Sequence, residues 1–181
     1  YRSDIARAFA ISSKNKPRIL DCTAGFGSDA FSLASLGCEV KLIERNPLIY
    51  ALLHDGIQRM EMAICSDEQL KKCINISCRF GDSICYLNQS SGDQSFFDAI
   101  YLDPMFPRKS KNAKSKKEIQ AVQNITDSED NYDKLLSGAL ESRVKRIVIK
   151  RPIKGSFLSG ISPSFSIKAR SIRYDVFINS C

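Results

Sequence analysis

The sequence predicts an α/β domain built on a mostly parallel β-sheet with helices on both faces. Strand and helix signals alternate from residue 18 onward, which is typical of such a sheet. Three successive strands lead into a glycine loop, a glutamate and an aspartate, so polar groups gather along one edge of the sheet. With 181 residues and 43% hydrophobic composition, residues 1–181 are expected to form a single domain.

The individual elements are predicted from hydrophobic periodicity and turn residues. Strands are expected at residues 18–22, 40–44, 74–80, 96–102 and 146–150. Helices are expected within residues 1–16, at 28–36, from 46 onward and at 132–141. Residues 164–169 and 174–178 are expected to pair as a C-terminal antiparallel hairpin, which brings the sheet to seven strands.

The helix that starts at Asn46-Pro47 has clear local signals. Asparagine is a preferred N-cap residue, and proline is well tolerated in the first helical turn. The apolar residues recur at helical spacing and predict the packed face of this helix: Ile49, Leu52, Leu53, Gly56 and Met60.

Composition and charge narrow the class of protein. The net charge of +7 favours a polyanionic partner such as a nucleic acid. The seven cysteines include no CxxC pair and His54 is the only histidine, so we expect no metal site and reduced, mostly buried thiols. No long apolar run and no signal-like segment is present, which predicts a soluble, cytoplasmic protein with no membrane partner.

A glycine loop joins the first strand to the following helix, in the segment from Asp21 to Asp29. Gly25 and Gly27 allow the backbone to approach a ligand, and the amides at the start of the helix favour polar or anionic groups. The segment also satisfies G-x-G-x-x-A, ending at Ala30, which is a Rossmann-like pattern. An ordinary tight turn is the alternative interpretation.

The next two strands end in further polar side chains. Glu44 can accept hydrogen bonds from both ribose hydroxyls of a nucleoside, and Asp82 with Ser83 can meet an adenine amino group. Alternatively, Glu44 is an exposed strand-end charge or forms a salt bridge with Arg45 or Lys41, and Asp82 belongs to a simple turn. The glycine loop and the two acids together predict a cofactor site for S-adenosylmethionine or NAD.

The segment Asp103-Pro104-Met105-Phe106-Pro107 follows a strongly apolar strand and suits methylation of an exocyclic amine on a planar base. Asp103 and the carbonyl of Pro104 can accept hydrogen bonds from the amine, and Phe106 can stack on the base. These three residues are the predicted catalytic residues. Tyr101, within the strand, is expected to serve packing alone.

Basic residues are concentrated downstream of the predicted catalytic segment. They lie where phosphates flanking a target base would pass, although a charge run is also typical of a solvated surface. The predicted RNA contacts are Arg108, Lys109, Lys111, Lys114, Lys116, Lys117, Lys150 and Arg151. No G-x-x-x-x-G-K-[ST] loop is present, which disfavours nucleotide hydrolysis.

Four motifs together carry a family resemblance: DCTAGFGSDAF, LIERNP, YLDPMFP and VIKRP. The chain resembles ribosomal RNA small subunit methyltransferase J over nearly its whole length. The resemblance implies a Rossmann-like class I methyltransferase that transfers a methyl group from S-adenosylmethionine to the N2 amine of a guanine in small-subunit (16S) ribosomal RNA. It also implies that the chain lacks an N-terminal segment present in the family.

The resemblance further implies a partner and a set of contacts. The partner is the small-subunit RNA or the assembled small ribosomal subunit. The implied cofactor contacts are Ser28, Asp29, Glu44, Arg45, Asp82, Ser83 and Asp103, beside Asp21, Gly25 and Gly27 of the glycine loop.

Three other functions remain open from the residues alone. The first is an amine methyltransferase that acts on DNA or protein. The second is an NAD-dependent oxidoreductase, because the glycine pattern and Glu44 suit that cofactor equally well. The third is a non-catalytic RNA-binding module.

Overall fold

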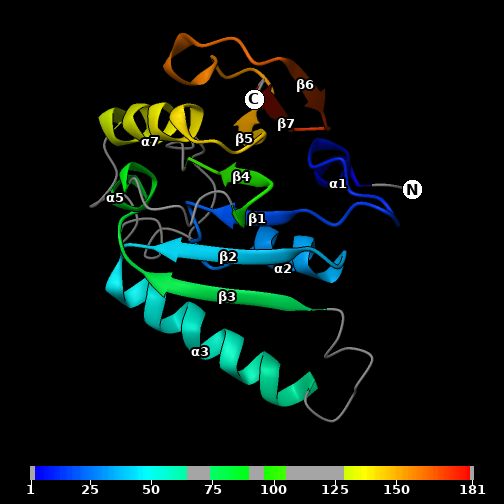
Figure 1. The fold of residues 1–181 in the computed structure, drawn as a ribbon, viewed down its shortest axis with the longest axis vertical. Helices are drawn as coiled ribbons and strands as arrows, with labels where there is room; N and C mark the ends of the chain where they lie inside the picture. The colour runs from blue at the N-terminus through cyan, green and yellow to red at the C-terminus, as the bar shows by residue number, and fades with distance from the viewer. Residues whose placement is uncertain (1–2, 65–73, 90–95, 105–128, 180–181) are drawn as a thin grey trace.

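A computed structural model describes residues 3–64, 74–89, 96–104 and 129–179 (Figure 1). The strands form one seven-stranded sheet in the order β3-β2-β1-β4-β5-β7-β6. The strands are β1 Arg18–Asp21, β2 Glu39–Glu44, β3 Asn75–Phe80, β4 Ala99–Leu102, β5 Arg146–Pro152, β6 Phe165–Lys168 and β7 Ile172–Ile178. The helices are α1 Asp4–Ala8, α2 Ser28–Ser35, α3 Pro47–Ile64, α5 Ser83–Asn88, α7 Glu129–Glu141 and the short 3-10 helix η2 Leu158–Gly160.

The sheet has the predicted mixed topology. Strands β1 to β5 are parallel to one another, while β7 pairs antiparallel with both β5 and β6. The carboxyl ends of the parallel strands therefore meet at a single edge, on the left in Figure 1. Ligands bind at this edge in open α/β sheets, and the three predicted polar strand ends all lie there.

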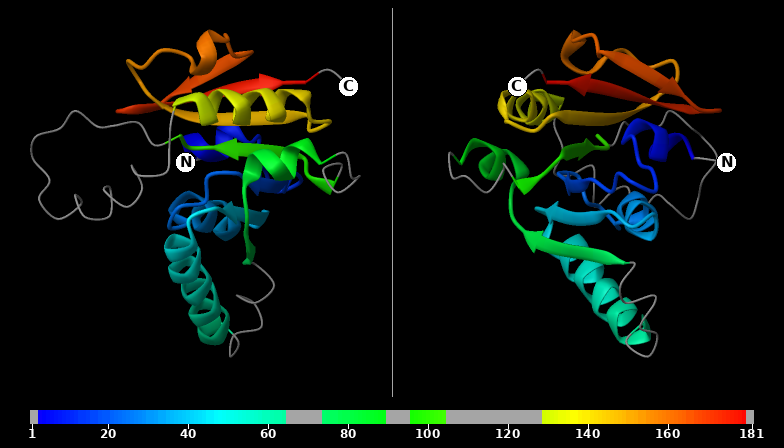
Figure 2. Two further views of the ribbon diagram at one scale, coloured as in Figure 1. Left: turned by 90° about the vertical axis from the view of Figure 1, so that its left-hand side faces the viewer. Right: turned by 45° about the vertical axis from the view of Figure 1, so that its right-hand side comes forward.

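Helices cover both faces of the sheet, as predicted (Figure 2). Successive strand residues point to opposite faces, so Tyr101 packs with α1, α2 and α3, while its neighbours Ile100 and Leu102 pack with α5 and α7. This alternation of fully buried residues explains why the central strands read as continuous apolar runs. No helix within the described ranges is long and apolar enough to cross a membrane.

Helix α3 begins as predicted but packs through a slightly different face. The side-chain oxygen of Asn46 caps it by accepting hydrogen bonds from the amides of Leu48 and Ile49, at 3.0 and 3.2 Å. Its buried residues are Ile49, Leu53 and Ile57, and the prediction that Leu52 is packed is wrong because that side chain is 53% exposed. A spacing of four keeps residues on one face, whereas Leu52 is rotated roughly 100° from Leu53.

Two other elements differ from the prediction. The strand expected at 96–102 begins only at Ala99, because Asp98 forms a loop contact in which its carboxylate accepts a hydrogen bond from the Arg18 amide at 2.8 Å. Helix α5 was not predicted. The four described cysteines are free thiols, with Cys22 and Cys38 buried, Cys78 half-buried and Cys85 exposed.

Candidate active site

The first strand ends in a buried acid that organises the glycine loop. The carboxylate of Asp21, which is 2% exposed, accepts hydrogen bonds from the Thr23 amide at 2.9 Å and the Thr23 hydroxyl at 3.3 Å. The Thr23 hydroxyl oxygen in turn accepts a hydrogen bond from the Asp103 amide at 2.7 Å. The ends of β1 and β4 are thus joined through one threonine.

Burial has a marked effect on Asp21. Removal from water raises its pKa to about 7, against the lowering effect of the Thr23 amide, and the charges of Asp103 and Asp29 add to the rise. The predicted cofactor contact at Asp21 therefore occupies an interior position behind the loop. Its observed side-chain contacts are with Thr23 at the start of the loop.

Both loop glycines adopt backbone conformations that suit glycine. Gly25 has φ +53° and Gly27 has φ +74°, in the left-handed region. A Cβ atom on Gly27 would lie 2.9 Å from the side chain of Leu53, so the loop packs closely on α3. Ser28 follows as the exposed first residue of α2.

Glu44 is oriented by backbone amides on both of its oxygens. One carboxylate oxygen accepts from the Gly25 amide at 2.9 Å and the other from the Asn46 amide at 2.8 Å. The side chain is only 9% exposed, so the alternative of an exposed surface charge is wrong. A carboxylate oxygen has capacity for more than one hydrogen bond, so Glu44 is pre-oriented and can still accept hydrogen bonds from a ligand.

Asp82 and Ser83 form the start of helix α5. The Asp82 carboxylate caps the helix, accepting hydrogen bonds from the amides of Ile84 and Cys85 at 2.7 and 3.2 Å. The Ser83 hydroxyl donates to the Cys22 carbonyl at 2.8 Å, which joins the end of β3 to the end of β1. The turn interpretation of this segment was therefore correct in part, since the acid is a helix cap that also lies at the pocket.

These strand ends surround one pocket at the carboxyl edge of the sheet. Its lining residues are Cys22, Thr23, Gly25, Ile43, Glu44, Arg45, Asn46, Ile49, Asp82, Ser83, Ile84, Asp103, Asn131, Tyr132 and Leu135. Six of the predicted site residues are in this lining: Gly25, Glu44, Arg45, Asp82, Ser83 and Asp103. Others do not line it: Asp21, Gly27, Ser28, Asp29, Pro104, Lys150 and Arg151.

Sequence reasoning missed the contribution of helix α7. Asn131, Tyr132 and Leu135 close one side of the pocket, and no functional role was predicted for any of them. The position of this helix in the chain was the signal that could have identified these residues. A helix that follows a strand of a parallel sheet starts at the carboxyl edge, so its first turns are candidates for lining a site there.

A charged cluster lies beside the pocket. The Lys150 ammonium donates to Asp29 at 2.7 Å and to Asp103 at 2.9 Å, and the three side chains are 24%, 28% and 31% exposed. Burial lowers the pKa of Lys150, but the two carboxylates outweigh burial and raise it above its ordinary value. Lys150 therefore stays positively charged.

Tyr101 joins the same cluster. Its ring packs edge-on against Phe9, as expected for a core residue, and its hydroxyl donates to Asp29 at 2.6 Å. Burial, followed by the charges of Asp103 and Asp29, raises its pKa well above the ordinary value, so the hydroxyl stays a donor. The expectation of packing alone was incomplete.

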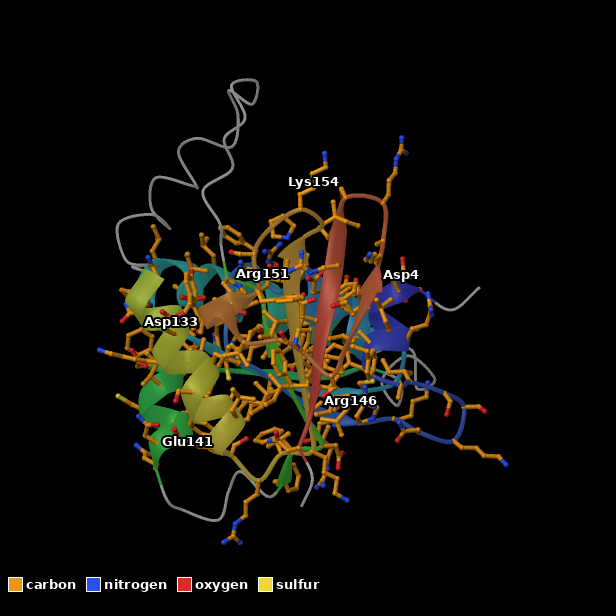
Figure 3. The ribbon with its side chains drawn as sticks, turned by 90° about the horizontal axis from the view of Figure 1, so that it is seen from above. Asp4, Asp133, Glu141, Arg146, Arg151 and Lys154 are labelled. Carbon is orange, nitrogen blue, oxygen red and sulfur yellow. The ribbon has the colours of Figure 1, made fainter. Side chains whose placement is uncertain are left out.

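The predicted RNA contacts on β5 have other partners in the structure. Arg151 is 4% exposed and its guanidinium donates to the carbonyl of Ser156 at 2.7 Å, so it is not displayed to a phosphate. Figure 3 shows Lys154 farther out, on the loop after β5. We therefore correct the prediction for Arg151, because its side chain is buried and its guanidinium is bound to the Ser156 carbonyl.

The remaining predictions concern the segment that starts at Pro104, most of which lies outside the described residues. Pro104 is described and buried, directly after Asp103. Phe106 and the downstream basic residues lie outside the described residues: Arg108, Lys109, Lys111, Lys114, Lys116 and Lys117. Among the described residues, no group of three or more His, Cys, Asp or Glu side chains could hold a metal ion.

The strand order, the glycine loop and the pocket define a Rossmann-like class I methyltransferase fold. The family model described as "Putative SAM-dependent methyltransferase" matches residues 1–179. The chain is 43% identical to ribosomal RNA small subunit methyltransferase J of Cellvibrio japonicus, over 96% of this chain and 65% of that protein. It is 38% identical to the protein of the same name from Nitrosococcus oceani, over 98% of this chain and 68% of that protein.

The chain therefore belongs to the ribosomal RNA small subunit methyltransferase J family of SAM-dependent methyltransferases, as the resemblance implied. It spans slightly less than two thirds of the Cellvibrio relative's length.

Solved structures agree with this assignment. A SAM-dependent methyltransferase from Neisseria gonorrhoeae superposes with a TM-score of 0.75 at 30% identity, covering 98% of this chain and 71% of that chain. Magnesium protoporphyrin IX methyltransferase from Synechocystis, solved with bound SAM, has a TM-score of 0.58 at 12% identity, covering 97% of this chain and 76% of that chain, and supports the fold alone.

Proposed function

We propose that this chain transfers a methyl group from S-adenosylmethionine to the exocyclic N2 amine of a guanine in small-subunit ribosomal RNA. The observation that carries the proposal is the position of Asp103, which lines the same pocket as Glu44 and Asp82. An acceptor for an amine thus lies beside a set of groups suited to a nucleoside. The names of the relatives support ribosomal RNA as the substrate.

The residues of the pocket fit S-adenosylmethionine. Glu44 would accept hydrogen bonds from the ribose hydroxyls, because two backbone amides already hold its carboxylate in position. Asp82 and Ser83 would lie at the adenine, and Arg45 beside the ribose. The proposed contacts also include Gly25, Gly27, Ser28 and Asp29 of the glycine loop, with Asp21 supporting the loop from behind.

The proposed reaction is a direct displacement. S-adenosylmethionine supplies an electrophilic methyl group, whose bond to sulfur breaks with its electron pair left on sulfur as the amine nitrogen forms the new bond. The Asp103 carboxylate and the Pro104 carbonyl would hold the amine in line and stabilise the positive charge that develops on nitrogen until the nitrogen releases one proton to water. Phe106 would stack on the base, which must be unpaired or flipped out.

The proposed RNA surface consists of the basic segment that follows the catalytic residues: Arg108, Lys109, Lys111, Lys114, Lys116 and Lys117. Its position next to Asp103 in the chain and the net charge of +7 support this assignment. Arg151 is excluded because it is buried.

The experiment is a transfer assay with labelled S-adenosylmethionine and small ribosomal subunits from cells that lack this methylation, followed by digestion to nucleosides. The Cellvibrio relative, with its full length, serves as the positive control. We expect label in N2-methylguanosine. Label in a different nucleoside would reject the guanine N2 assignment, and label only in the proteins of the subunit would support the alternative of a protein methyltransferase.

A second measurement addresses the alternative cofactor. Calorimetric titration with S-adenosylmethionine and with NAD should detect binding of the former alone. Tight binding of NAD without S-adenosylmethionine binding would overturn the proposal in favour of an oxidoreductase.

A further inference from the structure

We propose that Lys150 is a positioning residue that holds the Asp103 carboxylate toward the amine, and that it is not a phosphate contact. The inference rests on the proposed function, since it concerns how Asp103 acts in that reaction. It replaces the expectation that Lys150 binds RNA.

The geometry of the three side chains supports this role. Asp103 follows β4, Lys150 is on β5 and Asp29 is in the first turn of α2, so one ammonium joins three elements. Asp103 lines the pocket, whereas Lys150 and Asp29 lie outside the lining. The Lys150 ammonium nitrogen therefore donates a hydrogen bond to one carboxylate oxygen of Asp103 from beside the pocket, at 2.9 Å. A charge-assisted hydrogen bond of this kind restrains rotation of the carboxylate.

Asp29 and Tyr101 restrain the lysine in turn. Asp29 accepts from Lys150 at 2.7 Å and from the Tyr101 hydroxyl at 2.6 Å, so the second carboxylate is held by a core residue. The ammonium is thus held by Asp29, whose carboxylate is in turn held by the hydroxyl of the buried Tyr101. This arrangement is expected of a group that must present a reactive carboxylate in one orientation.

The charge around Lys150 disfavours a phosphate. Among the described residues, one ammonium faces the two carboxylates of Asp29 and Asp103, so these three side chains together carry one net negative charge. The nearby Asp21 carboxyl and the Tyr174 hydroxyl contribute no positive charge. A phosphate approaching Lys150 would also meet these two carboxylates, which weakens its attraction to the ammonium.

The same charges predict what loss of Lys150 would do. Without the ammonium, Asp103 and Asp29 would lose the cation that they share, and two neighbouring like charges favour protonation of one of the pair. A protonated Asp103 accepts hydrogen bonds poorly and cannot stabilise a cationic nitrogen. Transfer should therefore fall, and it should recover at higher pH.

The test compares Lys150→Met, which keeps the stem but not the charge, with Lys150→Arg and with Lys14→Met as the control. Lys14 is exposed and precedes the amino end of β1, at the opposite edge of the sheet. Single-turnover transfer to small-subunit RNA is measured against pH at saturating cofactor and RNA, and RNA affinity is measured against salt concentration. Melting temperature and calorimetric cofactor binding check the fold, and Lys150→Gln replaces Lys150→Met if the latter does not fold.

We expect Lys150→Met to lower the single-turnover rate at pH 7 by about 10-fold or more and to move the acid limb of the pH profile upward by roughly one unit. Lys150→Arg should recover part of the rate, and the salt dependence of RNA binding should match that of the wild type. The inference is overturned if the rate and profile stay unchanged, or if the variant instead reduces the salt slope by about one, as loss of a phosphate contact does.

A carboxyl ¹³C titration of Asp103 in the free protein separates this inference from the proposed function. Its midpoint should lie higher in Lys150→Met than in the wild type, with or without a substrate. If the midpoint shifts while the wild type methylates no RNA, the function fails and the pairing stands. An unshifted midpoint overturns the positioning role whatever the substrate proves to be.

Discussion

The hydroxyl oxygen of Thr23 accepts a hydrogen bond from the backbone amide of Asp103 at 2.7 Å, while the Thr23 hydroxyl donates to the buried Asp21 carboxylate. Through this contact the glycine loop after β1 and the proposed catalytic segment after β4 share one side chain. The pair of contacts couples the geometry of the cofactor pocket to the geometry of the reacting carboxylate.

Replacing Thr23 with valine should break this coupling with little change in volume. The Asp103 amide would lose its partner, so we expect the free energy of unfolding to fall by about 1–2 kcal/mol and methyl transfer to fall as Asp103 moves. Urea unfolding and single-turnover transfer measure the two effects. Thr23→Ser, which keeps the hydroxyl, is the matched control and should retain most of the transfer rate; equal losses in both variants would contradict the coupling.

Replacing Asp103 with alanine tests the proposed catalytic role. We expect S-adenosylmethionine binding to be partly retained, since Glu44 and Asp82 remain in the pocket, while transfer falls by a factor on the order of 100 or more. Calorimetry and single-turnover assays measure these quantities separately. A turnover equal to that of the wild type in this variant would rule out the catalytic role of Asp103. If the wild type transfers no methyl group and Asp103→Ala binds RNA as the wild type does, the chain would instead be a non-catalytic RNA-binding module.

Glu44→Gln tests the proposed ribose contact. The amide NH₂ group of glutamine would face either the Gly25 or the Asn46 amide, placing a donor against a donor, and the charge would be lost. We expect S-adenosylmethionine affinity to fall by roughly 10- to 100-fold, equivalent to about 1.4–2.7 kcal/mol. Glu39→Gln, at the amino end of the same strand, is the control and should leave the affinity unchanged.

The buried acid Asp21 predicts a pH dependence of stability. Its folded pKa of about 7 lies above the ordinary value of 3.8, so the folded protein retains a proton that the unfolded chain releases between these values. The stability that the protonated Asp21 contributes to the folded state is fully present below about pH 4 and is lost as pH rises toward 7. Above about pH 7 Asp21 causes no further change in the free energy of unfolding.

Asp21→Asn should remove this decline, because the asparagine stays neutral while its oxygen still accepts from Thr23. Relative to the wild type, the variant should gain unfolding free energy between pH 4 and 7, by at most about 1.4 kcal/mol per pH unit. Urea unfolding at several pH values measures the difference. A difference that does not vary with pH would show that Asp21 titrates near its ordinary value.

Much of the architecture follows from local patterns in the chain. The alternation of apolar strands with helices predicted the parallel sheet, and Asn46 and Pro47 marked the start of α3 correctly. The three polar strand ends were expected at one edge, and Glu44, Asp82 and the glycine loop do surround one pocket. In each case the signal lies within a few residues and reflects side-chain periodicity or backbone conformation.

The role of Lys150 could not be predicted in this way. Sequence alone showed a cation at a strand end, for which a phosphate partner was reasonable. In the folded chain, β4 and β5 pair so that Leu102 is opposite Ile149, and the next residues along, Asp103 and Lys150, emerge side by side. The register of two strands far apart in the sequence therefore decides that the partner is a carboxylate.

Arg151 and helix α7 are two further cases in which long-range packing, and not the local sequence, decides the surroundings of a side chain. Arg151 is buried with its guanidinium bound to the Ser156 carbonyl, and packing of α7 over the strand ends brings Tyr132 to the pocket. Residue types and short-range spacing were enough to predict the fold class and the gathering of polar strand ends at one edge of the sheet. The partners of the charged side chains depend on long-range packing and burial, because an ion pair forms only where the folded chain brings two groups together and removes them from competing water.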